Sequence, residues 1–452
     1  MMSEKYRAYP EYKSTDTDWL GEAPKYWKTI PVGRLFRRVK RTNFSDKDLL
    51  SVYRDHGVVP TSSRDDNNNK PSDDLTPYQL VEPNDLVMNK MKAWQGSIAI
   101  SEFEGIVSPA YFVYQPYSKL FDVAYPKYIH YLLRHPIYIA QYLRQSKGIR
   151  VSQWDLDPEE FQRIELLLPD KSEQKKIFNF LDNEIAKIDT LIEKQQQLIK
   201  LLKEKRQAVI SHAVTKGLNS NAPMRDSGVE WLGEVPEHWI VAKLSFRYQV
   251  LLGKMLDDKK ITGNFLAPYL RNTDVQWDSV NTVDLPQMDF RPEEQDRYSV
   301  RKGDLIVCEG GEIGRCAIWE NEEPVFYQKA LHRLRPSNAL SDNTRFMYYQ
   351  LFNAVHQERF ISGAGKSTIA HLPAETFRQF KFPYPPYDEQ EEISAFLDRQ
   401  KVQFDLLEQK VAQQIALLQE RRTALISAAV TGKIDVRNWQ APSQTTNKKI
   451  AA

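Results

Sequence analysis

The sequence carries two copies of one tryptophan-containing motif. Residues 19–27 read WLGEAPKYW and residues 231–239 read WLGEVPEHW, so that six of the nine positions agree, including both tryptophans. A chain that repeats itself must fold as two similar halves, and a fold predicted for one copy has to hold for the other.

A second, longer block repeats later in each half. EQKKIFNFLD from Glu173 matches EQEEISAFLD from Glu389, and we call the offset between these two residues the duplication spacing. In the same register, LLKEKRQAVISHAVT from Leu201 matches LLQERRTALISAAVT from Leu417 at ten of fifteen positions. The stretches between the repeated blocks, about 28–168 and 240–384, resemble each other only faintly, which indicates an order of variable, constant, variable and constant segments.

These blocks divide the chain into five segments. The expected segments are 1–168 with the first variable part, 169–217 as a first helix, 218–384 with the second variable part, 385–436 as a second helix, and 437–452 as a polar tail. The closing part of the two variable segments also corresponds, with Leu156 opposite Leu372 and Phe161 opposite Phe377.

The two constant segments are predicted to be long helices. Residues 171–215 contain no proline, and Gly217 stands where a helix would stop. Apolar residues recur every seven positions, as in coiled coils, with Gln195 as one polar exception. The expected helix-pairing and partner-docking residues are Leu181, Ile188, Leu202, Val209, Leu397, Phe404, Val411, Leu418 and Leu425.

The apolar stripe is wider than two helices need, which suggests that further helices dock on it. Because each helix follows its own variable segment, the simplest arrangement is an antiparallel coiled coil within one chain. The predicted fold class is therefore α/β (α+β), with two tandem globular domains separated by long paired helices. A dimerising coiled coil is the alternative that the repeat disfavours.

Composition excludes several classes of protein. No apolar run approaches the roughly 20 residues that span a bilayer, and the N-terminus has no apolar signal core. Cys308 and Cys316 are the only cysteines, too few for a disulfide framework or a four-ligand zinc site. We therefore expect a cytoplasmic protein without metal ligands and without a membrane anchor.

Three motifs resemble enzyme signatures but depart from them. Gly363–Thr368 reads GAGKST, although Phe360 stands where a Walker A motif needs its first glycine. Tyr384–Tyr387 reads YPPY, where adenine methyltransferases carry Asn or Asp in the first place, so a proline turn before the second helix is the better interpretation. Glu173–Lys175 resembles a nuclease triplet, but the second copy has lost the lysine.

Basic residues of the variable segments are candidate contacts to DNA, since Lys and Arg bind phosphate, and Arg, Asn and Gln read base edges. A run from Arg34 to Arg41 contains no acid, and Lys90 and Lys92 flank Met91 near Trp94. Arg150 and Lys366 recur at equivalent places, and Asn67 to Asn69 form a polar stretch. The candidate DNA-binding residues are Arg34, Arg37, Arg38, Lys40, Arg41, Lys90, Lys92, Lys147, Arg150, Arg315, Lys329, Arg333 and Lys366.

The repeated blocks WLGEVPEHW, PPYDEQEEISAFLD and LLQERRTALISAAVTGKID resemble those of type I restriction–modification specificity subunits, in the family's order and over nearly the whole chain. The resemblance implies two target-recognition domains, each reading one half of a bipartite site in double-stranded DNA. It further implies helices that set the spacing and dock two methyltransferase subunits. Those subunits would carry S-adenosylmethionine, and restriction subunits would use ATP and Mg²⁺.

On this interpretation the chain binds no cofactor and has no catalytic residues of its own. Two other functions remain open at this point: a coiled-coil adaptor that binds only proteins, and an enzyme, either a P-loop ATPase or a stand-alone DNA methyltransferase.

Overall fold

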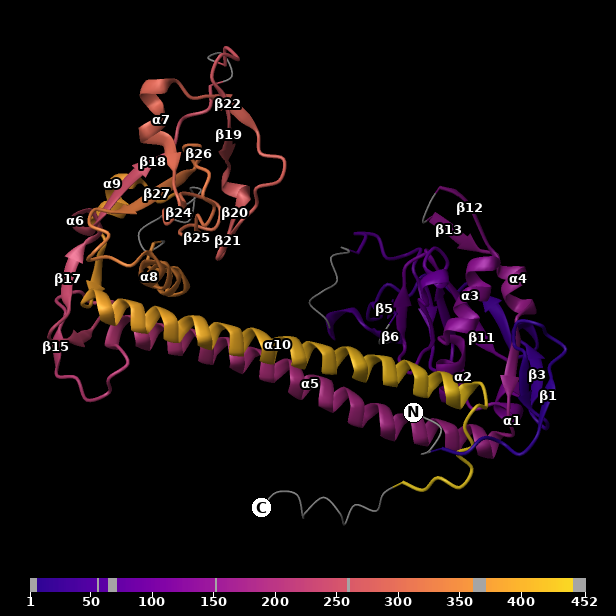
Figure 1. The fold of residues 1–452 in the computed structure, drawn as a ribbon. Helices are drawn as coiled ribbons and strands as arrows, with labels where there is room; N and C mark the ends of the chain where they lie inside the picture. Colours follow the sequence, from indigo (N-terminus) through magenta and orange to yellow (C-terminus); the bar gives the residue numbers. More distant parts are fainter. Residues whose placement is uncertain are drawn as a thin grey trace. The chain divides into compact units, whose positions relative to one another are not determined.

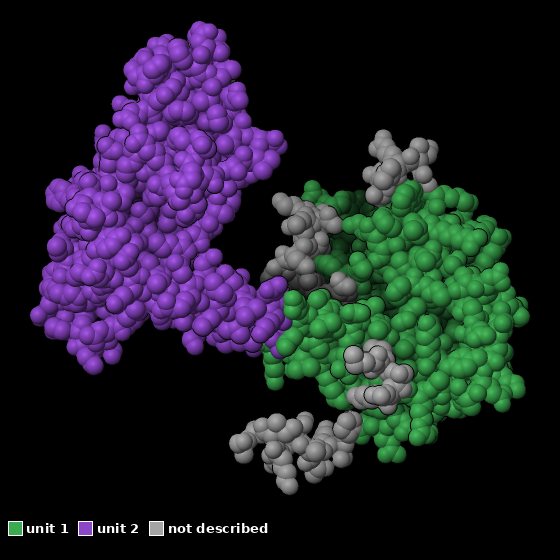
Figure 2. Space-filling view, in the orientation of Figure 1, with its two compact units in different colours: residues 1–194, 413–452 green, residues 195–412 purple. Residues whose placement is uncertain are grey.

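The structure is a computed structural model that describes residues 6–54, 57–63, 71–150, 153–257, 261–360 and 371–441, without the side chains of 148–150 and 153. The chain forms two compact units (Figure 2). Unit 1 comprises residues 1–194 and 413–452, and unit 2 comprises residues 195–412. We call the part of unit 1 that precedes residue 169 head 1, and residues 218–384 of unit 2 head 2.

Two long helices pass through both units. Helix α5 (Lys171–Lys216) begins directly after Pro169 and Asp170, and α10 (Tyr387–Val430) begins directly after Pro385 and Pro386 (Figure 1). Each helix is followed by a glycine with positive φ, 76° at Gly217 and 71° at Gly432, because glycine adopts this left-handed end conformation without steric penalty.

The helices pair antiparallel within each unit. In unit 1, Asp189 of α5 faces Arg422 of α10, and Lys176, earlier in α5, donates to the carbonyl of Arg437, which lies past the end of α10. In unit 2, Arg206 faces Asp405. The prediction of an antiparallel pair is therefore confirmed.

The expected heptad positions lie on the inner side of this pair. Leu181, Ile188, Leu397, Phe404, Val411 and Leu425 are buried, and Leu202, Val209 and Leu418 are half-buried. The neighbouring positions Leu191 and Leu198 are more than 40% exposed, so the apolar stripe continues onto the outer surface.

Head 1 is built on a four-stranded antiparallel sheet in the order β4-β11-β8-β9. Helices α2, α3 and α4 cover one face together with the ends of α5 and α10, and strands β5, β6, β7 and β10 cover the other. The elements of head 1 are β1 (Tyr12–Ser14), β2 (Glu22–Pro24), β3 (Lys28–Pro31), η1 (Val32–Arg34), β4 (Phe36–Val39), β5 (Leu50–Tyr53), β6 (Gly57–Pro60), η2 (Thr61–Ser63), β7 (Gln79–Val81), β8 (Leu86–Asn89), η3 (Ala93–Gln95), β9 (Ile98–Ile100), β10 (Gly105–Val107), β11 (Tyr111–Pro116), α1 (Ser118–Val123), α2 (Pro126–Leu133), α3 (Pro136–Arg144), β12 (Ser146–Arg150), β13 (Gln153–Leu156), α4 (Pro158–Arg163) and β14 (Glu165–Leu168).

Head 2 has a sheet of the same order, β18-β27-β24-β25. A second four-stranded sheet, β22-β19-β26-β23, replaces the smaller strand pairs of head 1. The elements of head 2 are β15 (Met224–Asp226), β16 (Glu234–Pro236), β17 (Ile240–Lys243), α6 (Leu244–Arg247), β18 (Tyr248–Leu252), β19 (Leu266–Leu270), η5 (Asn272–Asp274), β20 (Val275–Gln276), β21 (Ser279–Val280), β22 (Gln287–Asp289), α7 (Pro292–Tyr298), β23 (Ser299–Val300), β24 (Leu305–Cys308), β25 (Cys316–Ile318), β26 (Val325–Tyr327), β27 (Leu331–Pro336), α8 (Thr344–His356), α9 (Ala374–Gln379) and β28 (Lys381–Tyr384).

The framework is thus shared by two heads whose sequences barely match. Strand β3 pairs with β14 in head 1 just as β17 pairs with β28 in head 2, directly before each long helix. Apolar side chains on both faces of the central strands, rather than residue identity, specify such a sheet. Successive side chains face opposite sides, and both sides are covered, so β8 and β24 are buried almost throughout. The predicted fold class of two α/β heads with long paired helices is confirmed.

The repeated blocks meet where each head joins its helix. In head 1 the indole N–H of Trp27 donates to Glu173 at 3.3 Å, and in head 2 that of Trp239 donates to Glu389 at 3.1 Å. Burial raises the pKa of Glu173, and the hydrogen bonds from Tyr9 and Trp27 oppose that rise. The motifs are therefore similar because they build the same joint twice.

The segment after α10 completes the core of unit 1. Ile434 and Val436 are buried there, and the backbone N–H of Asp435 donates to the carbonyl of Arg7. Trp439 lies in the segment expected to be a polar tail, yet it packs edge-on against Phe180 with ring centroids 5.6 Å apart. The described part of that segment, up to residue 441, is thus not a free tail, because its tryptophan covers an aromatic ring of α5.

Among the described residues, no helix is both long and apolar enough to cross a membrane.

Candidate nucleic-acid interface

Four of the basic candidates line the edge strand of head 1. Arg34, Arg37, Arg38 and Lys40 are exposed on η1, β4 and the residue that follows. Arg37 donates to Gln115 of β11, and the guanidinium of Arg38 lies 4.0 Å from the ring centre of Phe112. These contacts hold the guanidinium groups of Arg37 and Arg38 at the exposed surface, where they can meet phosphate.

Arg41, the fifth residue of this run, has a different role. Its guanidinium forms ion pairs with Glu82 and with Asp85, whose side chain is 1% exposed. Burial raises the pKa of Asp85, and Arg41 opposes that rise. Arg41 is therefore tied to two carboxylates of the head, although its side chain is still 21% exposed, and its contact with DNA stays a prediction.

A second basic group of head 1 surrounds the loop after β8. Lys90 is half-buried and Lys92 is exposed, and the carbonyl of Lys90 accepts a hydrogen bond at 3.1 Å from the N–H of Leu156. This bond brings the hairpin of β12 and β13, which contains Lys147, to the loop. Lys147 is 77% exposed and only loosely paired with Asp157 at 3.3 Å. The side chain of Arg150, in the same hairpin, lies outside the described residues.

Aromatic side chains accompany these lysines. The rings of Trp94 and Trp154 meet edge to face with centroids 5.1 Å apart. A groove of about 810 Å³ runs beside them and is lined by Lys92, Trp94 and Arg54, with α3 forming its other wall. Cations next to aromatic rings suit nucleic acid, since the first bind phosphate and the second stack on bases.

The corresponding loop of head 2 has a different chemistry. It runs from Glu309 to Arg315 between β24 and β25, and the carbonyl of Glu309 accepts from the N–H of Leu372 at 2.8 Å. This bond is the counterpart of the one between Lys90 and Leu156, so the predicted correspondence of Leu156 and Leu372 is confirmed. The two heads hold equivalent loops by equivalent bonds but present lysines in one and carboxylates in the other.

Three basic candidates of head 2 differ in their exposure. Lys329 is exposed, whereas Arg315 is 16% exposed and donates to the carbonyl of Asn272. Arg333 is 1% exposed and donates to the carbonyl of Ser299 at 2.6 Å. We correct the prediction for Arg333, because a buried, hydrogen-bonded guanidinium on a central strand cannot reach DNA. Lys366 lies outside the described residues, as do Gly363–Thr368 and Asn67–Asn69.

The enzyme-like motifs have structural roles where they are described. Tyr384 is 2% exposed in β28, and Pro385 and Pro386 form the turn into α10, as the proline-turn interpretation predicted. Burial raises the pKa of the Cys308 thiol to about 11, which disfavours the reactive thiolate. In the described part of the chain, no group of three or more His, Cys, Asp or Glu residues is arranged to hold a metal ion.

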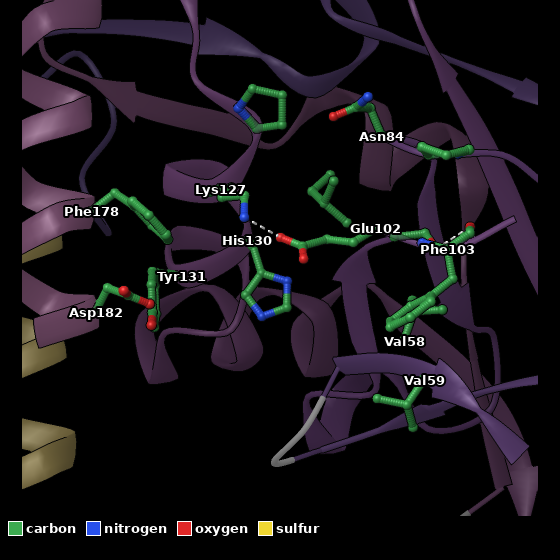
Figure 3. A pocket seen from close by; sticks show the side chains of 14 residues that line it. Val58, Val59, Asn84, Glu102, Phe103, Lys127, His130, Tyr131, Phe178 and Asp182 are labelled. Carbon is green, nitrogen blue, oxygen red and sulfur yellow. Dashed lines mark hydrogen bonds and ion pairs between the residues drawn. The ribbon is translucent and has the colours of Figure 1, made fainter. Parts of the chain in front are cut away.

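Unit 1 also contains a pocket that the sequence did not indicate. It measures about 520 Å³ and lies between α2, α5 and the loops at β6 and β9 (Figure 3). Lys127 and Glu102 form an ion pair of 2.7 Å across it, and Asp182 and Phe178 of α5 form one wall. Burial and the nearby Arg134 lower the pKa of His130 in this pocket to about 3, so this imidazole is neutral at pH 7.

The sequence analysis did not identify the residues that support the loop Glu309–Arg315 of head 2. Trp277, Asp278 and Arg345 support the loop of head 2, yet they are scattered over the variable segment and match nothing in head 1. The repeat could have indicated only identical residues separated by the duplication spacing, such as Gln174 and Gln390.

Comparison with known proteins gives a consistent result. A family model described as the type I restriction modification DNA specificity domain matches residues 24–201 and 250–416. The type I restriction enzyme EcoKI specificity subunit of Escherichia coli strain K12 is 20% identical over 445 residues, covering 93% of this chain and 92% of that protein. The MjaVIII specificity subunit of Methanocaldococcus jannaschii is 22% identical over 373 residues, covering 79% of this chain and 81% of that protein.

Two solved structures share the fold. One, from a study of complex assembly and conformational transition of the type I R-M system, has a TM-score of 0.64 at 16% identity and covers 91% of this chain and 99% of its own. The other, the HsdS subunit from Thermoanaerobacter tengcongensis, has a TM-score of 0.54 at 16% identity, with 91% and 98% coverage.

Proposed function

Because this chain belongs to the family of type I restriction modification DNA specificity proteins, we propose that it reads a bipartite sequence in double-stranded DNA, with each head reading one half. The observation that carries this proposal is the pair of equivalent loops after β8 and β24. Both are tied to the segment before α4 or α9 by one backbone bond, at Lys90 and at Glu309. A shared framework with different loop chemistry is what two different half-sites require.

In head 1 the surface cations supply the contacts that position the protein on phosphate. Two groups carry them, the edge strand with Arg37 and Arg38 and the loop with Lys90 and Lys92. Trp94 lies in the same loop and offers an aromatic surface to a base or sugar. In head 2 the exposed Lys329 lies next to Ala330, whose carbonyl accepts from the N–H of Glu309, so a cation again adjoins the loop.

The paired helices set the distance between the half-sites and dock the methyltransferase subunits. Exposed leucines recur at the duplication spacing: Leu191 and Leu407 are 46% and 45% exposed, and Leu201 and Leu417 are 60% and 63% exposed. Exposed apolar residues that recur in both copies suit two copies of one helical partner. S-adenosylmethionine, ATP and Mg²⁺ belong to the methyltransferase and restriction subunits, and this chain contributes recognition without catalysis.

The test is selection of bound duplexes from a random-sequence library by this chain co-expressed with a methyltransferase subunit. We expect a motif of two short specified halves with an unspecified gap of fixed length. Either of two results would contradict the proposal. Binding of duplex without any motif would leave a general DNA-binding scaffold, and no binding would favour the protein-only adaptor. ATP hydrolysis by the purified chain alone would favour the P-loop enzyme instead.

The spacing role has its own experiment. Inserting seven residues at the boundary of the units in both helices, after Lys194 in α5 and after Ala412 in α10, preserves the heptad pattern. The selected motif should keep both halves and lengthen its gap. An unchanged gap would contradict the spacer role, and loss of both halves would indicate that the helices no longer pair.

A further inference from the structure

The loop Glu309–Arg315 of head 2 presents one carboxylate that is held from two sides. The side chain of Glu312 is 49% exposed. One of its oxygens accepts the indole N–H of Trp277 at 2.6 Å, and the other pairs with Arg315 at 3.3 Å. Arg315 is itself fixed by the carbonyl of Asn272 at 3.1 Å. An exposed glutamate held in this way has lost most of the side-chain freedom that a surface glutamate normally keeps.

The loop backbone is also built for one conformation. Gly311 and Gly314 have φ values of 71° and 81°, which favour glycine, and a Cβ at Gly314 would lie 2.5 Å from Val355. The N–H of Gly314 donates to the carbonyl of Cys308 at 2.9 Å, which closes the loop. Both backbone and side chain therefore fix the direction of the Glu312 carboxylate.

Behind Trp277, the next residue connects the loop to the helices of the same unit. Asp278 receives a bidentate ion pair from Arg345 of α8, and Arg345 also donates to Asp398 of α10 at 2.8 Å. Lys401 of α10 pairs with Asp278 at 3.3 Å. These contacts lower the pKa of Asp278, whose φ of 60° is unusual for a residue with a side chain. We call Asp278, Arg345, Asp398 and Lys401 the bracket.

The equivalent residues that the structure describes in unit 1 form no such bracket. The N–H of Tyr125 donates to Gln174 in unit 1, and the N–H of Asn343 donates to Gln390 in unit 2, so Tyr125 and Asn343 hold equivalent positions. Lys127 follows Tyr125 by two residues, as Arg345 follows Asn343. Lys127 is therefore the counterpart of Arg345. Asp182 is the counterpart of Asp398 at the duplication spacing, and both Lys127 and Asp182 line the open pocket of Figure 3. Lys127 pairs there with Glu102. The bracket is therefore specific to unit 2 and is not part of the framework that the two units share.

We infer that Glu312 is a specificity-determining residue of the second half-site and that Trp277, with the bracket behind it, positions it. This inference rests on the proposed function. A carboxylate offers only acceptors, so the major-groove base edge that it recognises carries an exocyclic amino group, on cytosine or adenine. A carboxylate on a DNA-binding surface is repelled by the phosphate groups of the DNA. A carboxylate that is held pointing toward a base amino group gains a hydrogen bond that compensates for this repulsion.

The first experiment uses the full chain without DNA. Hydrogen–deuterium exchange of residues 309–315 is measured for the wild type, for Arg345→Gln, and for Lys127→Gln as the matched change in unit 1. We expect exchange in this loop to rise at least tenfold in Arg345→Gln, while Lys127→Gln leaves it unchanged. Equal exchange in wild type and Arg345→Gln would overturn the positioning role.

The second experiment repeats the library selection with the methyltransferase subunit, using Glu312→Ala and Trp277→Phe. Trp277→Phe keeps an aromatic ring against Phe352 but removes the donor to Glu312. We expect both variants to lose about tenfold discrimination at the same base pair of the second half-site, the usual effect of one lost base contact. The first half-site serves as the internal control and should be unchanged.

Two results would overturn the inference: an unchanged second half-site in Glu312→Ala, or an equal loss in both half-sites. A wild-type complex that selects no motif would instead contradict the proposed function, and with it the base-reading role of Glu312. The exchange experiment would still decide whether the bracket holds the loop, so the two failures are distinguishable.

Discussion

Arg206 and Asp405 face each other at 2.7 Å between the long helices of unit 2, and the same pair forms again in unit 1. There Arg422 and Asp189, their counterparts at the duplication spacing, are 3.1 Å apart. Each helix therefore gives an arginine in one unit and an aspartate in the other. This is the reciprocal pattern of a two-fold interface, formed here between two copies of a sequence within one chain.

Reversing one charge of this pair should destabilise the protein only slightly. The partners in unit 2 are 23% and 49% exposed, and partly exposed ion pairs contribute about 0.5 kcal/mol after solvent screening. Arg206→Glu should lower the free energy of unfolding by about 1 kcal/mol, since it also creates a repulsion. The double variant Arg206→Glu with Asp405→Arg should recover most of that loss in urea unfolding. A double variant less stable than the single one would contradict the pairing.

Replacing either of the two repeated glutamines should reduce the free energy of unfolding far more than the charge reversal at Arg206 does. Gln174 and Gln390 are fully buried, and each donates to two carbonyls and accepts one backbone N–H. Alanine at either position leaves these groups unsatisfied, which should reduce stability by about 3 kcal/mol. The exposed Gln196→Ala is the matched control and should stay within about 0.5 kcal/mol. A small effect at both buried positions would show that water replaces the side chain.

A methyl group at Gly432 should disrupt the joint between α10 and head 1. Its Cβ would lie 2.5 Å from ring carbons of Pro24 and 3.3 Å from Trp27, in addition to the strain of a positive φ. Gly228 has a similar φ of 66° with nothing within 4 Å of a Cβ, so Gly228→Ala isolates the backbone strain, about 1 kcal/mol. The free energy of unfolding, measured by thermal or urea unfolding, should fall by about 2 kcal/mol more in Gly432→Ala than in Gly228→Ala. An equal loss of stability in both variants would show that Pro24 and Trp27 shift to accommodate the new methyl group.

Stability should fall as the pH drops below 6.5. Burial lowers the pKa of His332 to about 4 and that of His135 to about 4, so the unfolded chain binds protons that the folded chain does not. The contribution of each histidine is fully present above pH 6.5 and decreases by up to about 1.4 kcal/mol per pH unit between 6.5 and 4.

Replacing His332 by glutamine tests this sign. Glutamine keeps a donor for the carbonyl of Leu372, which His332 contacts at 2.7 Å, but it does not titrate. Between pH 7 and pH 5 the free energy of unfolding should fall by about 2 kcal/mol less in the variant than in the wild type, as measured by urea unfolding at each pH. Parallel profiles for the two proteins would show that His332 is not buried as a neutral imidazole.

Substituting the two lysines of the head 1 loop should lower the affinity for DNA and should also make that affinity less dependent on salt concentration. Lys90→Ala with Lys92→Ala removes two expected phosphate contacts, so the slope of log affinity against log salt should decrease by about 2. Arg333→Lys is the contrasting variant, because its side chain is buried and should leave the slope unchanged. A slope unaffected by the lysine changes would place the phosphate contacts elsewhere on head 1.

The sequence by itself determined the architecture. Repeated blocks such as those at Trp27 and Trp239 indicated two similar halves, and apolar residues at intervals of seven predicted the long helices with bounds close to those observed. Periodicity and repetition can be read from a sequence because they describe how each residue relates to neighbours along the chain.

Only the tertiary structure decided which charges face outward and which are used internally. Arg38 is exposed, whereas Arg41, three residues later, is paired with Asp85, and Arg333 is buried on a central strand. The bracket around Asp278 likewise joins residues from a hairpin, α8 and α10 that no motif connects. The physical reason is that burial and ion pairing depend on neighbours brought together by folding, and these neighbours are distant in sequence.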